Sequence, residues 1–205
     1  MIRDKKVHMT WNVTPHAKLK QSSRFDKQDP ARFAGDGMSF KAKLIGILEV
    51  SGPRGDRICQ EALSELKMAV KAAGEHKQKI TLHVALDGLR IRDEKTGDCL
   101  YHHQVHKISF IAQDLTDARA FGYIFGSPDM GHRFFGIKTE KSASQVVIAM
   151  RDLFQVVFDL KKKEIERAKQ QLEMQQKFLA TRAAETAPKV ILYLYLQQSL
   201  RFDND

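Results

Sequence analysis

The chain has 205 residues and a mass of 23.4 kDa, which fits one domain of ordinary size with tails. Its formal net charge of +9 favours acidic partners: nucleic acid, anionic lipid or an acidic peptide. The two cysteines argue against a disulfide framework, and the first thirty residues show no secretory signal. No apolar run approaches the roughly 18 residues of a membrane span. Composition therefore predicts a soluble intracellular domain.

The first predicted strand follows a polar lead-in. Residues 1–30 are mixed in charge and have no apolar period, so we predict that they are disordered. From Met38 to Val50, alternating apolar and polar residues lead into a nearly continuous apolar run. This pattern predicts a long strand, with Gly46 as a bulge or kink.

A helix is predicted after the turn at residues 51–55, where glycine and proline interrupt the strand. Asp56 is a suitable N-cap, and the apolar residues that follow recur at helical spacing. Gly74 is suited to end the helix. The sequence thus places one amphipathic helix directly after the first strand.

The middle of the chain predicts a meander of short strands. After a basic connector the apolar period changes from 3.6 to 2, and turn residues recur at short intervals. Asp87-Gly88 predicts a two-residue hairpin turn. Seven antiparallel strands with these turns indicate an α+β fold, with two packed sheets or a partly open barrel. The predicted strands cover residues 38–50, 80–86, 89–91, 99–101, 108–112, 121–125 and 133–138.

A final helix is predicted from about Ser144, because Ser142 and Gln145 have the spacing of a capping box. One apolar row on this helix faces a core, and a second row lies beside it. A helix that only capped a barrel would need one row, so the second predicts another contact. The second row is Val147, Phe154 and Phe158. We predict a solvated extension of the helix over residues 164–182 and an irregular tail over residues 183–205.

Several segments resemble the phosphotyrosine-binding (PTB) domain of the Disabled adaptor family, with insect members the most similar. The resemblance runs from about Arg32 to Lys163. It is carried by residues 40–46, 54–56, 74–80, 93–97, 105–112, 119–123 and 151–155. It implies a PTB domain over residues 31–163 with a pleckstrin-homology-like fold. In such a fold two orthogonal antiparallel sheets carry an extra helix after the first strand and a C-terminal helix that caps one end.

The resemblance also implies a peptide-binding site. The family binds Asn-Pro-x-Tyr motifs in the cytoplasmic tails of lipoprotein-receptor relatives, without a requirement for tyrosine phosphorylation. The strand over residues 108–112 would pair with an extended peptide through its open edge. The second row of the final helix would form the facing wall. The predicted peptide-binding residues are Ser109, Phe110, Ile111, Gly126, His132, Phe154 and Phe158.

A second implied site binds phosphoinositide head groups, notably phosphatidylinositol 4,5-bisphosphate. Lys41 and Lys43 share one face of the first strand because side chains alternate along a strand. Basic groups from separate segments would converge on the phosphorylated ring through charge-assisted hydrogen bonds. The predicted residues are Lys41, Lys43, His76, Lys77 and Arg119. These sites together predict an adaptor for endocytosis or signalling, peripheral at the plasma membrane and endocytic vesicles.

The sequence does not predict an enzyme or a cofactor. It has no glycine-rich nucleotide loop, nucleophile elbow or recognisable pair of carboxylates. Cys99, His102, His103 and His106 suggest a metal site, but no second cysteine pair completes a tetrahedral set, so strand-edge histidines are the interpretation. One alternative function is a membrane-targeting module that binds lipid only. A nucleic-acid binder is a further alternative, which lacks a recognised aromatic and basic platform.

Overall fold

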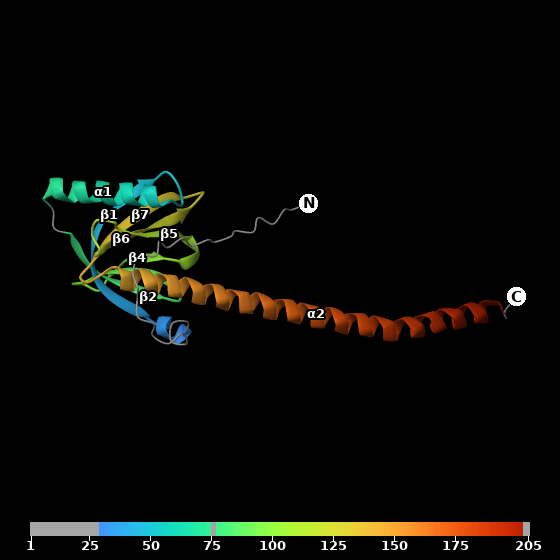
Figure 1. The fold of residues 1–205 in the computed structure, drawn as a ribbon. Helices are drawn as coiled ribbons and strands as arrows, with labels where there is room; N and C mark the ends of the chain where they lie inside the picture. The colour runs from blue at the N-terminus through green and yellow to red at the C-terminus, as the bar shows by residue number, and fades with distance from the viewer. Residues whose placement is uncertain (1–28, 75–76, 203–205) are drawn as a thin grey trace. The chain divides into compact units, whose positions relative to one another are not determined.

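The computed structural model describes residues 29–74 and 77–202 (Figure 1). The chain divides into two compact units, residues 1–157 and 158–205, and helix α2 (Ser144–Phe202) contributes to both. Most of the predicted disordered lead-in lies outside the described residues. Its end does not, because Pro30 begins a short 3-10 helix that carries the buried Phe33.

The first unit is built on a seven-stranded antiparallel sheet, as predicted, with strand order β4-β3-β2-β1-β7-β6-β5. α1 and one short 3-10 helix lie between strands, and a second 3-10 helix precedes the first strand. The elements are η2 (Pro30–Phe33), β1 (Met38–Val50), α1 (Asp56–Ala73), β2 (Gln78–Ala85), β3 (Gly88–Asp93), β4 (Cys99–His103), η3 (Val105–Lys107), β5 (Ile108–Gln113), β6 (Ala120–Ser127) and β7 (Gly131–Thr139).

β1 is long enough to belong to both halves of the sheet. It pairs with β2 over residues 38–44 and with β7 over residues 42–50. Its register with β7 shifts between Leu44 and Gly46, which confirms the irregularity predicted there. Such a bulge bends a strand and increases its twist. The predicted pair of sheets is therefore one hydrogen-bonded sheet whose halves share β1.

Apolar side chains on the two faces of the sheet form two separate clusters. The larger cluster joins Phe33 and all the strands of the sheet to residues 143–157 at the start of α2. The smaller cluster joins α1 to one face of β1, β5, β6 and β7. Figure 1 shows α1 on one side of the strands and the start of α2 on the other. The two helices thus protect opposite faces of the sheet from water.

Two predicted boundaries differ from the structure by one residue. Gly55 is the N-cap of α1, and Asp56 is its first helical residue, where a carboxylate is favourable near the positive end of the helix dipole. The β2–β3 hairpin loop is Leu86-Asp87, because Gly88 already pairs with Ala85. Gly88 has φ 138°, and an added Cβ would overlap the backbone of β4. Gly88 therefore allows the backbones of β3 and β4 to approach closely.

Both ends of α1 and the start of α2 follow ordinary capping rules. Gly74 closes α1 in the left-handed conformation, with φ 63°, as predicted. Ser142 Oγ accepts a hydrogen bond from the backbone N–H of Ser144 at 3.3 Å, which caps the start of α2, whereas the predicted capping box would use the N–H of Gln145.

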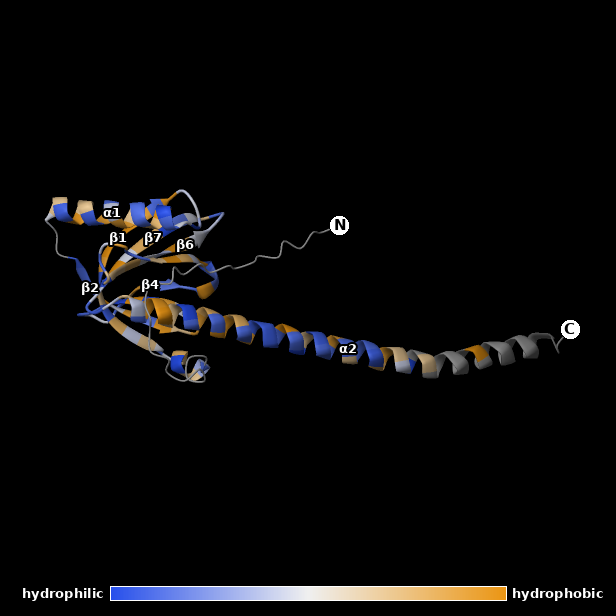
Figure 2. Cartoon of the chain, viewed as in Figure 1, coloured by the Kyte–Doolittle hydropathy of each residue, from blue (hydrophilic) through white to orange (hydrophobic). Residues whose placement is uncertain are grey.

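The second unit is the continuation of α2. The helix extends to Phe202, so the prediction of an irregular tail is wrong for residues 183–202. Once a helix has formed, each further residue that carries an N–H adds a hydrogen bond without a new nucleation cost, and this outweighs the missing donor of Pro188. Every side chain from Leu160 to Arg182 is exposed. In Figure 2 most of this segment is hydrophilic, with apolar residues at intervals.

Candidate functional site

The sheet has an open edge at β5. β5 is the last strand in the sheet order and pairs with β6 alone among the described strands. Its outer backbone N–H and C=O groups are therefore available to a further strand. The start of α2 lies beside the far end of β5, because the Gln113 side chain donates a hydrogen bond to Ser144 Oγ at 3.4 Å. A peptide added to this edge would therefore lie close to α2.

The side chains of β5 divide between the two faces of the sheet. Ile108 and Ile111 belong to the larger apolar cluster, which includes α2. Phe110 packs against the smaller cluster, beneath α1. A register shift between Ile108 and Phe110 interrupts the simple alternation. Ser109 Oγ donates a hydrogen bond to the Pro53 carbonyl oxygen at 2.7 Å, in the turn before α1.

The structure therefore separates part of the predicted peptide-binding set. Ile111 and Phe154 share the larger cluster, whereas Phe110 lies on the α1 side. Phe154 is only 7% exposed. Phe158 is 61% exposed and lies in the second unit, so only Phe154 of this helical pair is in the same unit as β5.

Gly126 and His132 face each other near the tip of the β6–β7 hairpin. An added Cβ at Gly126, where φ is 153°, would overlap the carbonyl oxygen of Gly131. Only glycine allows the two strands to approach so closely here. The start of β5 lies next to this end of the hairpin, because Ile108 pairs with Phe125. The structure thus brings Gly126 and His132 to one end of the open edge.

A buried histidine supports this end of β6. His103 ends β4, an outer strand of the sheet, and is only 4% exposed, so its ring lies in the core rather than in water. Its ring stacks on Phe125 with centroids 3.9 Å apart, and its Nδ1 lies 2.7 Å from the Tyr123 hydroxyl in a hydrogen bond. Burial, with Arg133 nearby, lowers the pKa of His103 to about 4. The ring is therefore neutral near pH 7 and acts as part of the core.

The basic residues form a row across the sheet. Lys43 pairs in register with Lys79 of β2 and with Lys138 of β7, and directly opposed residues share a face. Ala42 and Leu44 belong to the larger cluster, so these lysines point to the opposite face. Lys79 and Lys138 could not be predicted from the sequence, because only the strand order brings them beside Lys43.

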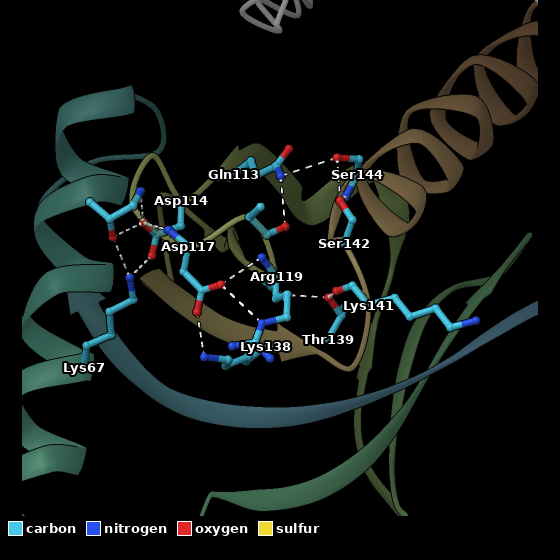
Figure 3. Close-up of polar contacts among 12 residues, drawn as sticks. Lys67, Gln113, Asp114, Asp117, Arg119, Lys138, Thr139, Lys141, Ser142 and Ser144 are labelled. Atoms are coloured by element: carbon cyan, nitrogen blue, oxygen red, sulfur yellow. Dashed lines mark hydrogen bonds and ion pairs between the residues drawn. The ribbon is translucent and has the colours of Figure 1, made fainter. Parts of the chain in front are cut away.

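Carboxylates hold several of these cations in place. Glu94 lies 3.5 Å from Lys41 and 4.0 Å from Lys79. Asp117 accepts a 2.6 Å hydrogen bond from Lys138 Nζ and lies 3.6 Å from Arg119 Nε (Figure 3). The bond from Lys138, and then that from the Arg119 backbone N–H, lowers the pKa of Asp117 to about 2. Asp117 is therefore ionised and positions both cations at neutral pH.

Lys43 and Lys77 differ from these paired residues. Within the described part of the chain, neither has an ion-pair partner. Lys43 is exposed, and Lys77 is half-buried at the start of β2. His76 lies outside the described residues. The structure thus brings Lys41, Lys43, Lys79 and Lys138 together on one face of the sheet.

The described residues contain no group of three or more His, Cys, Asp or Glu side chains that could hold a metal ion. A search of the same residues finds no helix with the length and apolar character needed to cross a membrane.

Comparison with known proteins identifies the domain. A family model described as the phosphotyrosine interaction domain (PTB/PID) matches residues 40–164. A second, described as Disabled homolog 2-like, sulfatide-binding motifs, matches residues 27–47. The solution structure of the C-terminal phosphotyrosine interaction domain of APBB2 from mouse has a TM-score of 0.53 and 19% identity, and the match covers 58% of this chain and 85% of that one. This likeness supports the fold.

Two curated relatives differ widely in their sequence identity to this chain. Protein disabled from Drosophila melanogaster is 78% identical over 147 residues, which are 72% of this chain and 7% of that protein. PTB domain-containing engulfment adapter protein 1 from Mus musculus is 28% identical over 196 residues, 91% of this chain and 60% of that protein. The chain thus spans only part of the length of either relative.

The fold and the family model together define an interaction domain of the PTB class. The chain belongs to the phosphotyrosine interaction domain (PTB/PID) family, and its predicted membership of the Disabled adaptors is confirmed.

Proposed function

We propose that this domain binds Asn-Pro-x-Tyr peptides in lipoprotein-receptor-type cytoplasmic tails while it engages anionic lipid at the plasma membrane. The observation that supports this proposal most directly is the open edge of β5, with Phe154 of α2 in the same apolar cluster as Ile111. Adaptors of this kind serve endocytosis or signalling.

The peptide would bind as an additional strand. Its backbone would complete the ladder at the β5 edge, and its side chains would provide specificity. Ile111 and Phe154 offer apolar contact on the side that faces α2. The peptide tyrosine would lie near Gly126 and His132, at the end of the edge where β5 begins.

The lipid would bind to the basic row on the opposite face of the sheet. Lys43 and Lys77 are available for phosphate oxygens, and Asp117 and Glu94 hold neighbouring cations in position. The match of residues 27–47 to sulfatide-binding motifs supports an anionic lipid ligand. The candidate lipid head groups are a bisphosphorylated inositol and a sulfated sugar, which share acidic ester oxygens.

Calorimetric titration with an unphosphorylated Phe-x-Asn-Pro-x-Tyr peptide tests the peptide site. The Phe154→Val variant should lose binding, because truncation removes apolar contact at the α2 wall. Phe178→Val is a matched control, since Phe178 is an exposed aromatic of the second unit. Full binding by Phe154→Val would contradict the proposed position of the peptide.

Sedimentation with vesicles tests the lipid site. Neutral vesicles, vesicles with phosphatidylinositol 4,5-bisphosphate and vesicles with sulfatide distinguish the head groups. Lys43→Glu should weaken binding by about tenfold or more, because each basic residue near an anionic surface contributes about 1 kcal/mol and this change reverses the charge. Lys177→Glu changes the net charge equally on the second unit. An equal loss in both variants would contradict a localised site.

The alternative function is a membrane-targeting module that binds lipid only. It is favoured by the row of basic residues and by the match to sulfatide-binding motifs. If the parent chain binds anionic vesicles and fails to bind the peptide, this alternative is supported and the peptide adaptor is not.

A further inference from the structure

The exposed part of α2 carries an apolar residue at every seventh position. Phe158, Ile165, Leu172 and Leu179 are each between 56% and 63% exposed, although all are large apolar side chains. We call these four residues the seam. In a straight α-helix a step of seven residues returns to nearly the same face, with a drift of about 20°. The seam is therefore a line of apolar side chains spaced about 10.5 Å apart along the axis of a helix that is otherwise mostly polar.

The seam has the width of a coiled-coil contact. Three steps of seven give a total drift of about 60°, which is narrower than the roughly 100° stripe of a helix that packs on a broad apolar surface. A strict seven-residue repeat is the pattern of two helices that supercoil with a left-handed twist. Among the other exposed apolar residues between 158 and 182, Leu160 and Met174 lie on the opposite side of the helix, whereas Phe178 lies beside the seam, one residue before Leu179.

The charges beside the seam fit a second copy in parallel orientation. With the seam at position a of the heptad, Glu164 is at g and Lys169 is at e. In a parallel pair a g residue faces the e residue five positions later on the partner helix. Glu164 of each helix would therefore meet Lys169 of the other, twice in a symmetric dimer. In the single chain Lys169 lies 3.9 Å from Glu173, and Glu164 accepts a 2.9 Å hydrogen bond from Lys161, so pairing with a second chain would replace these exposed contacts.

We propose that residues 158–182 form a parallel two-stranded coiled coil with a second copy of this chain. The d positions are small, polar or charged, and like charges at the first and last of them face each other in a parallel pair, which lowers the affinity and makes the association concentration-dependent. They are Lys161, Ala168, Gln175 and Arg182. A dimer would carry two copies of the PTB domain, so this inference goes beyond the ligand sites proposed above.

Sedimentation equilibrium of the full chain over a range of concentrations tests this proposal. The apparent mass should rise from 23.4 kDa towards twice that value. Leu172→Glu should raise the dissociation constant by roughly tenfold or more, because it places a charge in the apolar contact. Met174→Glu makes the same charge change on the opposite side and should leave association unchanged. Glutamate is a good helix former, and circular dichroism checks that both variants keep the parent's helix content.

A charge exchange tests the orientation. Glu164→Lys alone should weaken the dimer, because it would face Lys169 of the other chain, and the addition of Lys169→Glu should restore it. Failure of the double variant to recover would overturn the parallel arrangement. A parent chain that stays monomeric throughout would overturn the dimer. If such a monomer bound anionic vesicles through Leu172, the seam would be a membrane contact instead.

Discussion

Gly122 of β6 faces Gly136 of β7 across the ladder, and the ring of Phe134 occupies the space beside it. A Cβ added at Gly122 would overlap this ring, which is fully buried in the smaller cluster. The absence of a side chain is therefore what allows α1 and the sheet to pack around Phe134. This is a packing requirement at a single residue rather than a turn requirement.

Gly122→Ala should lower the free energy of unfolding by about 1–3 kcal/mol, because an additional methyl group in a packed core forces neighbouring side chains to move. Gly52→Ala is the control, since a Cβ there would meet Ile58 at an ordinary contact distance of 3.6 Å. The control should change stability by less than about 0.5 kcal/mol. Urea denaturation of both variants measures the difference, and equal midpoints would contradict the role of Phe134.

His103 makes stability depend on pH in a defined window. Its pKa is lowered from 6.5 to about 4 in the folded chain, chiefly by burial. Between these values the unfolded chain binds a proton that the folded chain excludes, so stability falls as the pH falls from 6.5 towards 4. The loss from pH 6.5 to pH 5 should be about 1–2 kcal/mol. Urea midpoints for the parent and His103→Gln test this, and an unchanged slope in the variant would exclude His103 as the cause.

At the scale of elements, the side chains at the tip of the β6–β7 hairpin determine whether phosphorylation of a ligand tyrosine would strengthen binding. His132 is half-buried there, and the adjacent Arg133 is exposed. A phosphate group gains most from two or more cationic donors held in fixed positions. Within the described strands β6 and β7, Arg133 is the one arginine. The hairpin therefore offers limited compensation for the cost of removing water from a phosphate.

Phosphorylation of the ligand tyrosine should leave peptide affinity unchanged or reduce it. Paired calorimetric titrations with the phosphorylated and unphosphorylated peptides measure this directly. A clear gain for the phosphopeptide would show that cations from other elements reach the pocket. Arg133→Gln would then identify whether this side chain supplies the gain.

The elements also show what the sequence could and could not predict. The strands and α1 could be predicted from local alternation, helical spacing and the positions of glycines. The irregularity near Gly46 could be predicted because a glycine interrupts an apolar run. The strand order depends on contacts between distant segments. The alignment of Lys43 with Lys138 and the burial of His103 between aromatic rings follow from that order. Ile108 lies in the larger cluster with Ile111 rather than on the side of Phe110, because the register shift in β5 interrupts the alternation between Ile108 and Phe110.

At the scale of the whole molecule, the proposed peptide and lipid sites would act on one membrane surface. A domain held by lipid meets a membrane-attached tail at a high effective concentration, so the two weak contacts reinforce each other. On vesicles that carry both the anionic lipid and a lipid-linked Asn-Pro-x-Tyr peptide, apparent affinity should exceed that of either ligand alone by about 10²-fold or more. Vesicle sedimentation with each ligand singly and with both measures this gain.

Variants measured on the same vesicles distinguish a gain in affinity from two sites on one domain from a gain that needs two domains in a dimer. Lys43→Glu and Phe154→Val should each remove most of the gain, because each abolishes one of the two linked contacts. Leu172→Glu should reduce it less, since a monomer retains both sites of one domain while losing the second copy. An affinity for the doubly loaded vesicles that equals the sum of the separate affinities would mean that one domain cannot reach both ligands at once.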